Sequence, residues 1–401
     1  MNNATIKERL DKVIMASYGR YPLAMVKGEG CRLFDADGKE YLDFLSGIAV
    51  CGLGHCHSAV VAAAQRQVAE LIHVSNLYYT LPQTELAEKL VAHSFADKVF
   101  FCNSGAEANE AAIKLARKAS EPQRFEIISL VGSFHGRTLA ALAATGQTRF
   151  QQGFEPMPQG FKHAPFGDLA ALEQMITPST CAILCEPLQG EGGVRPLSPE
   201  YLRGIRTLCD RHGLFLIFDE VQTGVGRSGT LFAHQQLGVE PDIMTLAKSL
   251  AGGLPIGAML AREKIAAALT PGSHASTFGG NPVVCAAANA ALDVILADGF
   301  LASVRKKGEY FRAGLDKLAA RFPAKIATAR GMGLILGLVF TEEGAAKGGE
   351  TVTKMMERGF LINFTAGIAL RFVPPLIVSE AEIDRLLAAL GEVFAEIFTA
   401  G

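Results

Sequence analysis

Short apolar runs alternate with helical segments through the middle of the chain, and this alternation is the strongest constraint on its fold. The runs, between residues 98 and 261, are KVFFC, FEIISLV, CAILC, LFLIF, DIMTLA and IGAMLA. Strands that are apolar on both faces are typical of a mainly parallel sheet that helices cover on each side. The helix before LFLIF is well marked, with Ser198 as its cap, Pro199 in its first turn and Gly213 after its end. The pattern predicts an α/β fold.

The regions on either side of these runs predict a second, smaller domain. Residues 32–44 have alternating stretches around Asp37-Gly38, which indicates a β-hairpin. From Ser58, a candidate helix cap, apolar residues recur at helical spacing. After residue 290 a helical stretch is followed by strands and a final helix. We expect a large α/β domain over residues 58–288 and a small α+β domain built from residues 1–57 and 289–401, with the hairpin packed against the C-terminal part.

Composition and charge restrict the partners and the compartment. The chain has 38 basic and 40 acidic residues and no basic run, which argues against nucleic acid or a membrane surface as partner. The N-terminus lacks the apolar segment of a signal peptide, and GMGLILGLVF (331–340) is too short to span a bilayer. The eight cysteines form no C-x-x-C pair, and CGLGHCH is better explained as a loop than as a metal site. We expect a cytoplasmic protein with reduced cysteines and no metal.

Two connections are candidates for loops beside a site. Residues 146–168 form a longer connection than is usual. The segment GVGRSG, with Gly224, Gly226 and Gly229, matches the dinucleotide fingerprint G-x-G-x-x-G. That fingerprint needs its first glycine directly after a strand and a helix opening on the third, whereas five residues intervene here. A flexible loop is therefore the better interpretation.

Three features at strand ends together point to pyridoxal phosphate as a cofactor. Asp219 ends the apolar run LFLIF, and Lys248 follows DIMTLA among small apolar residues that would lower its pKa and make its amine nucleophilic. Ser104 and Glu107 fit a capping box at the start of a helix, where free backbone amides can hold a phosphate. Each feature alone also fits a purely structural role. Their combination indicates a lysine, an acid for the pyridine nitrogen and a phosphate cradle.

The sequence resembles the class III, fold type I, pyridoxal-phosphate-dependent aminotransferases over essentially its whole length. The matching stretches are GIAVCGLGHCH, SNLYYT, FCNSGAEANEAAIKLAR, SFHGRT, CEPLQGEGGV, FDEVQTGVGRSG, LAKSLAGGLPIGA, STFGGNP and LRFVPPL. The resemblance implies that Lys248 binds the cofactor covalently and that Asp219 pairs with the pyridine nitrogen. It also implies two further sets of contacts. Those to the cofactor are Ser104, Gly105, Ala106, Phe134, Val221, Gln222 and Thr277. Those to the substrate are Arg137, Ser276, Glu191 and Arg371.

The resemblance also implies a homodimer, because Ser276 and Thr277 would reach the site of the partner subunit. Ala106 departs from the family, since many relatives carry a hydroxyl residue there and the phosphate would then depend more on backbone amides. Taken one at a time, four of these residues also fit a purely structural role. Phe134 could belong to the core, Arg137 could be a surface charge, Arg371 could be an ion-pair partner and Glu191 could be a turn residue.

Within the family, the sequence is most similar to enzymes that transfer the δ-amino group of N-acetylornithine to 2-oxoglutarate in arginine biosynthesis. Ornithine or another ω-amino acid, such as succinyl-diaminopimelate, is the alternative donor. A mutase that shifts an amino group within glutamate semialdehyde belongs to another enzyme class. A regulatory protein of the same fold is disfavoured, because Lys248 and Asp219 are both present.

Overall fold

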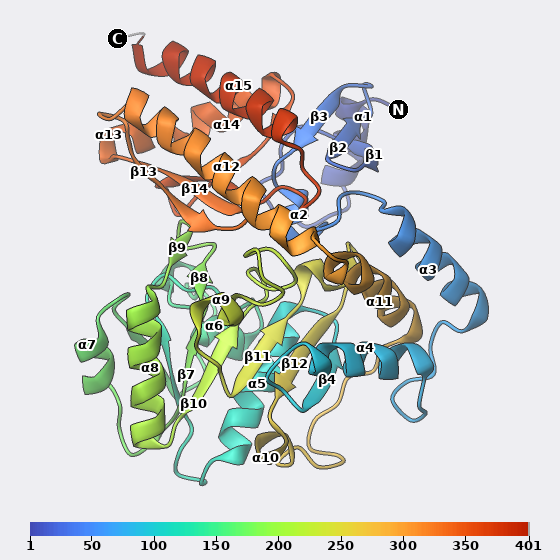
Figure 1. Ribbon diagram of the computed structural model, residues 1–401, viewed down its shortest axis with the longest axis vertical. Coiled ribbons are helices and arrows are strands. Elements are labelled where there is room, and N and C mark those ends of the chain that lie inside the picture. Colours follow the sequence, from blue (N-terminus) through green and yellow to red (C-terminus); the bar gives the residue numbers. More distant parts are fainter. Residues whose placement is uncertain (400–401) are drawn as a thin grey trace.

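The centre of the molecule is a seven-stranded sheet, seen in a computed structural model that describes residues 1–399 (Figure 1). In space its strands follow the order β4, β12, β11, β10, β7, β5, β6. Their bounds are Lys98–Cys102 (β4), Gly257–Ala261 (β12), Ile243–Leu246 (β11), Phe215–Asp219 (β10), Thr180–Cys185 (β7), Glu126–Leu130 (β5) and Phe161–Ala164 (β6). Only β12 runs antiparallel to its neighbours, β11 and β4. The predicted mainly parallel sheet is confirmed.

Helices cover both faces of this sheet. Ile217 of β10 packs in one apolar cluster with α5 (Gly105–Ala119), whereas Leu216 and Phe218 pack in another with α8 (Pro199–His212). Because successive strand residues point to opposite faces, α5 and α8 lie on opposite sides. The other helices between residues 58 and 296 are α3 (Ser58–Glu70), α4 (Leu81–Ala92), α6 (Leu139–Ala144), α7 (Leu169–Gln174), α9 (Ala233–Leu237), α10 (Glu263–Ala266) and α11 (Pro282–Leu296), with 3-10 turns η1 (Thr148–Phe150) and η2 (Lys248–Ala251).

Local signals set the ends of α8 as predicted. Ser198 Oγ accepts a hydrogen bond from the Tyr201 amide at 3.1 Å, Pro199 is the first helical residue, and Gly213 ends the helix with φ +61°. For α3 the expected cap is wrong by one position. Ser58 is its first helical residue, because His57, with ψ 126°, is the non-helical residue before it.

A second part of the molecule lies above the large sheet in Figure 1 and joins the two ends of the chain. One sheet has the order β1 (Met25–Glu29), β2 (Arg32–Asp35), β3 (Glu40–Asp43), β15 (Phe360–Leu361), and Asp37-Gly38 lies in the predicted hairpin turn between β2 and β3. The other has the order β13 (Ile326–Met332), β14 (Ile335–Phe340), β17 (Ala369–Phe372), β16 (Asn363–Thr365). The helices are α12 (Phe300–Arg321), α13 (Glu342–Ala345), α14 (Gly348–Glu357) and α15 (Glu380–Thr399).

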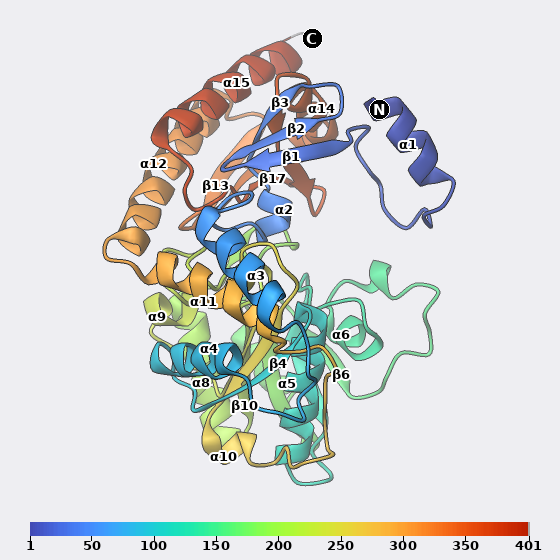
Figure 2. The ribbon, with the colours of Figure 1, turned by 90° about the vertical axis from the view of Figure 1, so that its right-hand side faces the viewer.

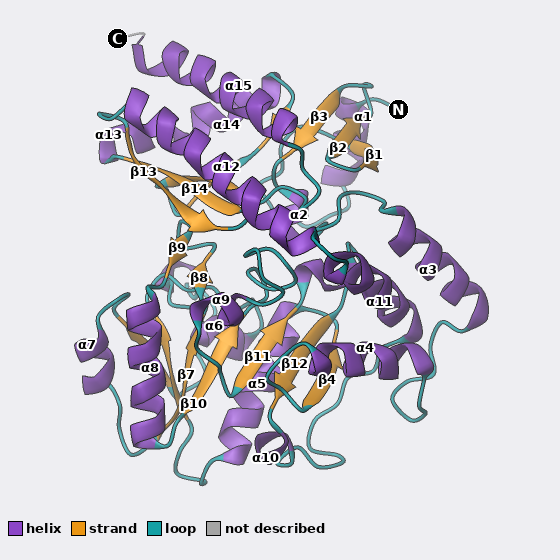
Figure 3. Cartoon of the chain, viewed as in Figure 1, coloured by secondary structure: helices purple, strands orange, loops and turns teal. Residues whose placement is uncertain are grey.

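The N-terminal hairpin packs with the C-terminal region, as the sequence suggests. β3 pairs in parallel with β15, with Leu42 opposite Phe360. Leu42 and Phe44 also share an apolar cluster with α12, β14 and α15; the helices and strands of this part are shown in Figure 3. By contrast, α1 (Asn3–Asp11) buries no residue and stands away from the body of the molecule (Figure 2). Two small elements, α2 (Ser46–Ala49) and the ribbon of β8 (Leu188–Gln189) and β9 (Arg195–Pro196), lie between the large sheet and the upper part.

One connection differs from the sequence-based expectation, and the expected domain boundary is not tested by the structure. The connection 146–168 contains an edge strand, β6, that the sequence did not indicate. The expected domain boundary between residues 288 and 289 falls within α11, so the division into two domains stays a prediction. No single helix among residues 1–399 is long and apolar enough to span a membrane; α11 and α12 pass that test only as a pair, bent by 70° where they meet.

Candidate active site

A cavity of about 470 Å³ lies beyond the carboxyl ends of β4, β10 and β11. In open α/β sheets this edge is where ligands bind, because the loops after the strands gather there. Most of the residues predicted for the site line this one cavity. They are Ser104, Gly105, Ala106, Phe134, Arg137, Glu191, Asp219, Val221, Gln222 and Lys248. Arg371 reaches it through Glu191, whereas Ser276 and Thr277 do not line it.

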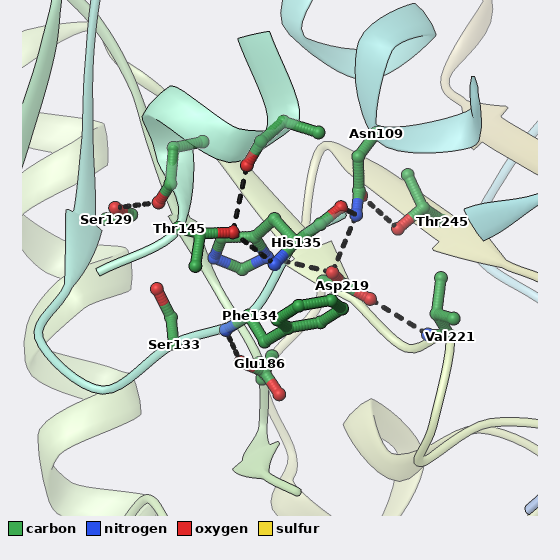
Figure 4. Close-up of polar contacts among 12 residues, drawn as sticks. Asn109, Ser129, Ser133, Phe134, His135, Thr145, Glu186, Asp219, Val221 and Thr245 are labelled. Carbon is green, nitrogen blue, oxygen red and sulfur yellow. Dashed lines mark hydrogen bonds and ion pairs between the residues drawn. The ribbon is translucent and has the colours of Figure 1, made fainter. Parts of the chain in front are cut away.

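Asp219, the last residue of β10, is buried, with only 4% of its surface exposed. Asn109 Nδ2 donates a hydrogen bond to its Oδ2 at 2.7 Å, and the Val221 amide donates to its Oδ1 at 3.0 Å. His135 Nδ1 lies 2.8 Å from Oδ2 (Figure 4). A carboxylate only accepts hydrogen bonds, so Nδ1 carries the hydrogen in this contact. Three donors thus fix the carboxylate at the floor of the cavity.

Asn109 is itself held in one orientation. Thr245 Oγ1 donates to Asn109 Oδ1 at 2.8 Å, while Asn109 Nδ2 also donates to the His135 carbonyl at 2.7 Å (Figure 4). The amide therefore presents its NH₂ group to Asp219. Neither Asn109 nor His135 was predicted from the sequence. The available signals were the position of Asn109 one helical turn after Gly105 and the place of His135 inside SFHGRT.

Lys248 follows β11 and opens η2 with a φ of +36°. Strained backbone of this kind in a non-glycine residue is concentrated at functional sites. The Lys248 amine makes no hydrogen bond or ion pair with any residue of the described range 1–399, so it is free to react. Burial lowers the pKa of Lys248, and the charges of Asp219 and Glu191 oppose that shift. A lower pKa makes more of the uncharged, nucleophilic amine available.

The N-terminus of α5 faces the same cavity. Ser104 Oγ accepts from the Glu107 amide at 3.2 Å, which is half of the predicted capping box. The other half is wrong: Glu107 Oε2 accepts from the Asn103 amide at 2.7 Å rather than from Ser104. The amides of Gly105 and Ala106, in the first helical turn, have no intrahelical acceptor. A side chain at Gly105 would lie 2.7 Å from Val221 Cγ1, so only glycine leaves this approach open.

Phe134 lies beside Asp219 in the close-up, and its amide is fixed by Glu186 (Figure 4). Glu186 Oε1 accepts from the Phe134 amide at 2.8 Å, and Oε2 accepts from the Gly190 amide at 3.3 Å. Burial raises the pKa of Glu186 well above its usual value, and the nearby charge of Asp219 adds to this. The sequence analysis quoted Glu186 within CEPLQGEGGV but gave it no role.

Arg137 lies at the exposed rim of the cavity. Its guanidinium lies 4.1 Å from the centre of the Phe150 ring and 5.5 Å from that of Phe134. No carboxylate of residues 1–399 forms an ion pair with Arg137, so its donors remain available for an anion. The connection 146–168, a candidate for lining the site, contributes Phe150 as a support for Arg137 and no residue to the cavity lining itself.

Arg371 and Glu191 form an ion pair at another side of the cavity. Arg371 is 1% exposed, and it also donates to Gln222 Oε1 at 3.2 Å and to Asn363 Oδ1 at 3.3 Å. The Glu191 side chain is 30% exposed. Burial tends to raise the pKa of Glu191, but the Arg371 guanidinium outweighs burial and leaves that pKa below its usual value. A buried cation is thus neutralised by a more accessible carboxylate.

Ser276 and Thr277 lie beside the site rather than in it. Ser276 Oγ accepts a hydrogen bond from Asn103 Nδ2 at 3.2 Å, and Asn103 lines the cavity. Asn76 Nδ2 donates to the carbonyls of Ser276 and Gly279, each at 3.0 Å. The turn is therefore anchored next to the start of α5.

The fold and the cavity at the strand ends define an α/β transferase of fold type I. The chain belongs to the aminotransferase class-III family, whose sequence model matches residues 13–394.

Individual relatives match over nearly the whole chain. The acetylornithine aminotransferase of Caldanaerobacter subterraneus subsp. tengcongensis is 51% identical over 390 residues, which cover 96% of this chain and 98% of that protein. The acetylornithine aminotransferase of Methanocaldococcus jannaschii is 52% identical over 387 residues and 95% of each chain. Among solved structures, an ornithine aminotransferase of Toxoplasma gondii with partial occupancy of pyridoxal phosphate has a TM-score of 0.93, at 32% identity and over 98% and 94% of the two chains.

Proposed function

We propose that the protein transfers the δ-amino group of N-acetylornithine to 2-oxoglutarate, with pyridoxal 5'-phosphate as cofactor, in arginine biosynthesis in the cytoplasm. Membership of the aminotransferase family supports the reaction class. Relatives of about half-identical sequence that are named acetylornithine aminotransferases support the donor.

The residues around the cavity fit the cofactor. The free amides of Gly105 and Ala106 at the positive end of α5 suit its phosphate. Ala106 has no hydroxyl, so phosphate binding there relies on backbone donors. Lys248 has an unpaired amine for the aldehyde carbon, and Asp219 offers a fixed carboxylate for the pyridine nitrogen. Phe134 and Val221 would hold the two faces of the ring, and Gln222 would lie near its 3-hydroxyl.

Asp219 and Lys248 would have separate roles in the reaction. Pyridoxal phosphate supplies an electron-accepting ring that stabilises the electron pair left on the substrate carbon. Asp219 keeps the proton on the ring nitrogen, because its negative charge is fixed by three donors. The Lys248 amine would hold the cofactor at its aldehyde carbon and would serve as the general base and acid that carries the proton to and from the reacting substrate carbon.

The observation that carries the choice of substrates is that one cavity has the unpaired Arg137 at its rim and the Glu191–Arg371 pair at another side. N-acetylornithine has one carboxylate, far from the reacting amine, whereas glutamate has a second one beside its amine. Arg137 would bind the distal carboxylate of both substrates by a charge-assisted pair. Arg371 would bind the second carboxylate, and Glu191 would neutralise Arg371 whenever that carboxylate is absent.

Two copies of the chain are proposed to form a homodimer with shared sites. Large apolar side chains next to the Ser276–Thr277 turn are strongly exposed, with Leu77 83%, Tyr79 102% and Phe278 61% exposed. Large apolar side chains exposed in one region of the surface favour a protein partner. Ser276 and Thr277 would then contact the phosphate or substrate in the partner's cavity.

A panel of ω-amino donors with 2-oxoglutarate tests the function. We expect kcat/KM to be highest for N-acetylornithine. Ornithine is the second candidate, favoured by the likeness to the Toxoplasma gondii enzyme, and succinyl-diaminopimelate is a third. A clear preference for either of these would replace the proposed donor, and activity without an acceptor keto acid would indicate a mutase.

A further inference from the structure

The loop GVGRSG, which neither cofactor nor substrate explains, carries a fully buried charge. Arg227 is 0% exposed and, with Arg371, heads the largest fully buried side chains of the described residues. None of the carboxylates of residues 1–399 forms an ion pair with it. Burial lowers the pKa of Arg227 to about 9, with the charge of Asp43 opposing the shift. A buried guanidinium is costly unless its donors are used.

Arg227 holds backbone from the second part of the molecule with its Nη groups, while its buried Nε has no partner among the described residues. Nη1 donates to the Leu334 carbonyl at 3.0 Å and also to the Pro374 carbonyl. Nη2 lies 3.5 Å from Ser46 Oγ. The two backbones are also hydrogen-bonded, because the Leu334 amide donates to the Arg227 carbonyl at 3.0 Å. Arg227 and Leu334 are thus joined in both directions.

Glycines make this close approach possible. Gly226 and Gly229 have φ +86° and +95°, a region that side chains disfavour. From the other side, a Cβ at Gly333 would lie 2.4 Å from the Ser228 carbonyl carbon. Gly333 therefore permits the close contact between the two chain segments, and Gly226 and Gly229 give the loop the positive φ angles of its turns.

The segments that Arg227 holds are those next to Arg371. Leu334 lies directly before β14, and Pro374 follows two residues after β17. These two strands pair, with Gly337 opposite Arg371. Ser46 Oγ donates to the carbonyl of Val373 at 2.6 Å and so fixes the same end of β17. One buried side chain thereby clamps both strands of the pair that carries Arg371.

We propose that Arg227 is a positioning residue that sets the place of Arg371 over the cavity and so determines recognition of the dicarboxylate substrate. The expectation that the 2-oxoglutarate half-reaction is the one impaired rests on the proposed function, in which Arg371 binds the second carboxylate. The clamp itself does not depend on the substrate's identity.

The test compares Arg227→Lys and Arg227→Met holoenzymes with wild type. Lysine keeps the charge but lacks the planar fork that reaches several acceptors, so it restores function only in part. We expect KM for 2-oxoglutarate to rise about tenfold or more, since small misplacements of a positioning cation have such effects. KM for N-acetylornithine should change little. Amide hydrogen exchange should become faster in peptides covering residues 330–340 and 369–376.

Arg124→Lys is the matched control. Arg124 likewise donates to two backbone carbonyls, those of Thr180 at 2.9 Å and His212 at 2.8 Å, but these lie at the start of β7 and the end of α8, at the sheet edge opposite the cavity. It should change neither the ratio of the two KM values nor exchange near Arg371. If the Arg227 variants do not fold, Ser46→Ala, which removes the hydrogen bond to Val373, is the substitute. It should also raise KM for 2-oxoglutarate more than KM for N-acetylornithine, but by a smaller factor.

The two hypotheses fail in different ways. If Arg227 variants behave like Arg124→Lys while Arg371→Ala still raises KM for 2-oxoglutarate, the positioning role is wrong and the proposed function stands. If Arg371→Ala leaves KM for 2-oxoglutarate unchanged, the assignment of Arg371 is wrong. In that case faster exchange in the Arg227 variants still supports the clamp, and unchanged exchange overturns it.

Discussion

Asn109 Nδ2 and Asp219 Oδ2 lie 2.7 Å apart although 110 residues separate them in the sequence. The contact joins helix α5, whose N-terminus faces the cavity, to the end of β10. It also means that the Asp219 carboxylate is held by its own hydrogen bonds before any ligand arrives, so its negative charge is fixed where a pyridine nitrogen would lie.

Asp219→Asn should therefore reduce kcat by several orders of magnitude. The amide has nearly the shape of the carboxylate but lacks the charge that keeps the ring nitrogen protonated. Stopped-flow rates of each half-reaction and thermal unfolding measure the two consequences separately. Asp242→Asn is the control, because Asp242 accepts from the Leu216 amide at 2.8 Å and pairs with Arg206 before the start of β11. It should cost stability and not turnover; near-normal turnover of Asp219→Asn would show that another acid serves the ring.

Lys248 should carry the cofactor. Its amine is unpaired within the described range, and burial lowers its pKa. Borohydride reduction of purified protein, followed by peptide mapping, should place the cofactor on the peptide that contains Lys248. The Lys248→Ala protein should remain unlabelled. A label on another lysine, such as the exposed Lys114, would contradict the assignment.

The local part of this site could be predicted from sequence. Asp219 and Lys248 each follow a short apolar run, and the start of α5 has its own capping signal, so strand ends and a helix start are legible in neighbouring residues. The roles of Asn109, His135 and Glu186 were not predictable, because they arise from contacts to residues 110, 84 and 52 positions away.

The fold shows the same limit. An apolar run indicates a buried strand but not its direction, so the antiparallel course of β12 came only with the structure. β6 was missed because FKHA is a short edge strand that includes polar residues and is only partly buried. The segment GVGRSG was interpreted as a flexible loop, whereas Arg227 and Ser228 within it make a close contact with Gly333 and Leu334, far away in the sequence.

The site should be completed across a dimer interface. Mixing Lys248→Ala chains with inactive Thr277→Val chains should restore activity, because one site of each heterodimer would then combine Lys248 and Thr277 from unmutated segments. Random reassociation would leave about a quarter of all sites intact. Mass spectrometry should first confirm that heterodimers form. No recovery in their presence would argue that each chain has a self-contained site.

Stability should depend on pH through His55. His55 Nε2 lies 2.7 Å from Asp43 Oδ2. Burial alone would lower the pKa of His55, but the bond and charge of Asp43 outweigh it and raise the pKa from 6.5 to about 10. The stabilisation is fully present below pH 6.5. Between about pH 6.5 and 10 the folded protein keeps a proton that the unfolded chain loses, so the free energy of unfolding should fall as the pH rises.

Urea unfolding of His55→Asn across this range checks the sign. The variant should be less stable than wild type at pH 6, and the difference should shrink towards pH 10. His93→Asn, at an exposed histidine, should follow the wild-type curve. A stability difference that is the same at both ends of the range would mean that His55 acts by packing alone.

The last prediction concerns how the cavity accepts two unlike substrates. Arg371 is buried and paired with Glu191, which lies within the glycine-rich segment Gly190–Gly193 and has a side chain that is 30% exposed. An unpaired, desolvated guanidinium would be costly, so Glu191 should cover it when N-acetylornithine is bound and leave it when glutamate arrives. Arg371→Ala should then damage the 2-oxoglutarate half-reaction far more than the N-acetylornithine half-reaction. Glu191→Gln should make glutamate a better donor relative to N-acetylornithine, because Arg371 is no longer neutralised. Single-turnover spectra of each half-reaction decide between these outcomes, and equal losses in both halves for Arg371→Ala would refute the exchange of partners.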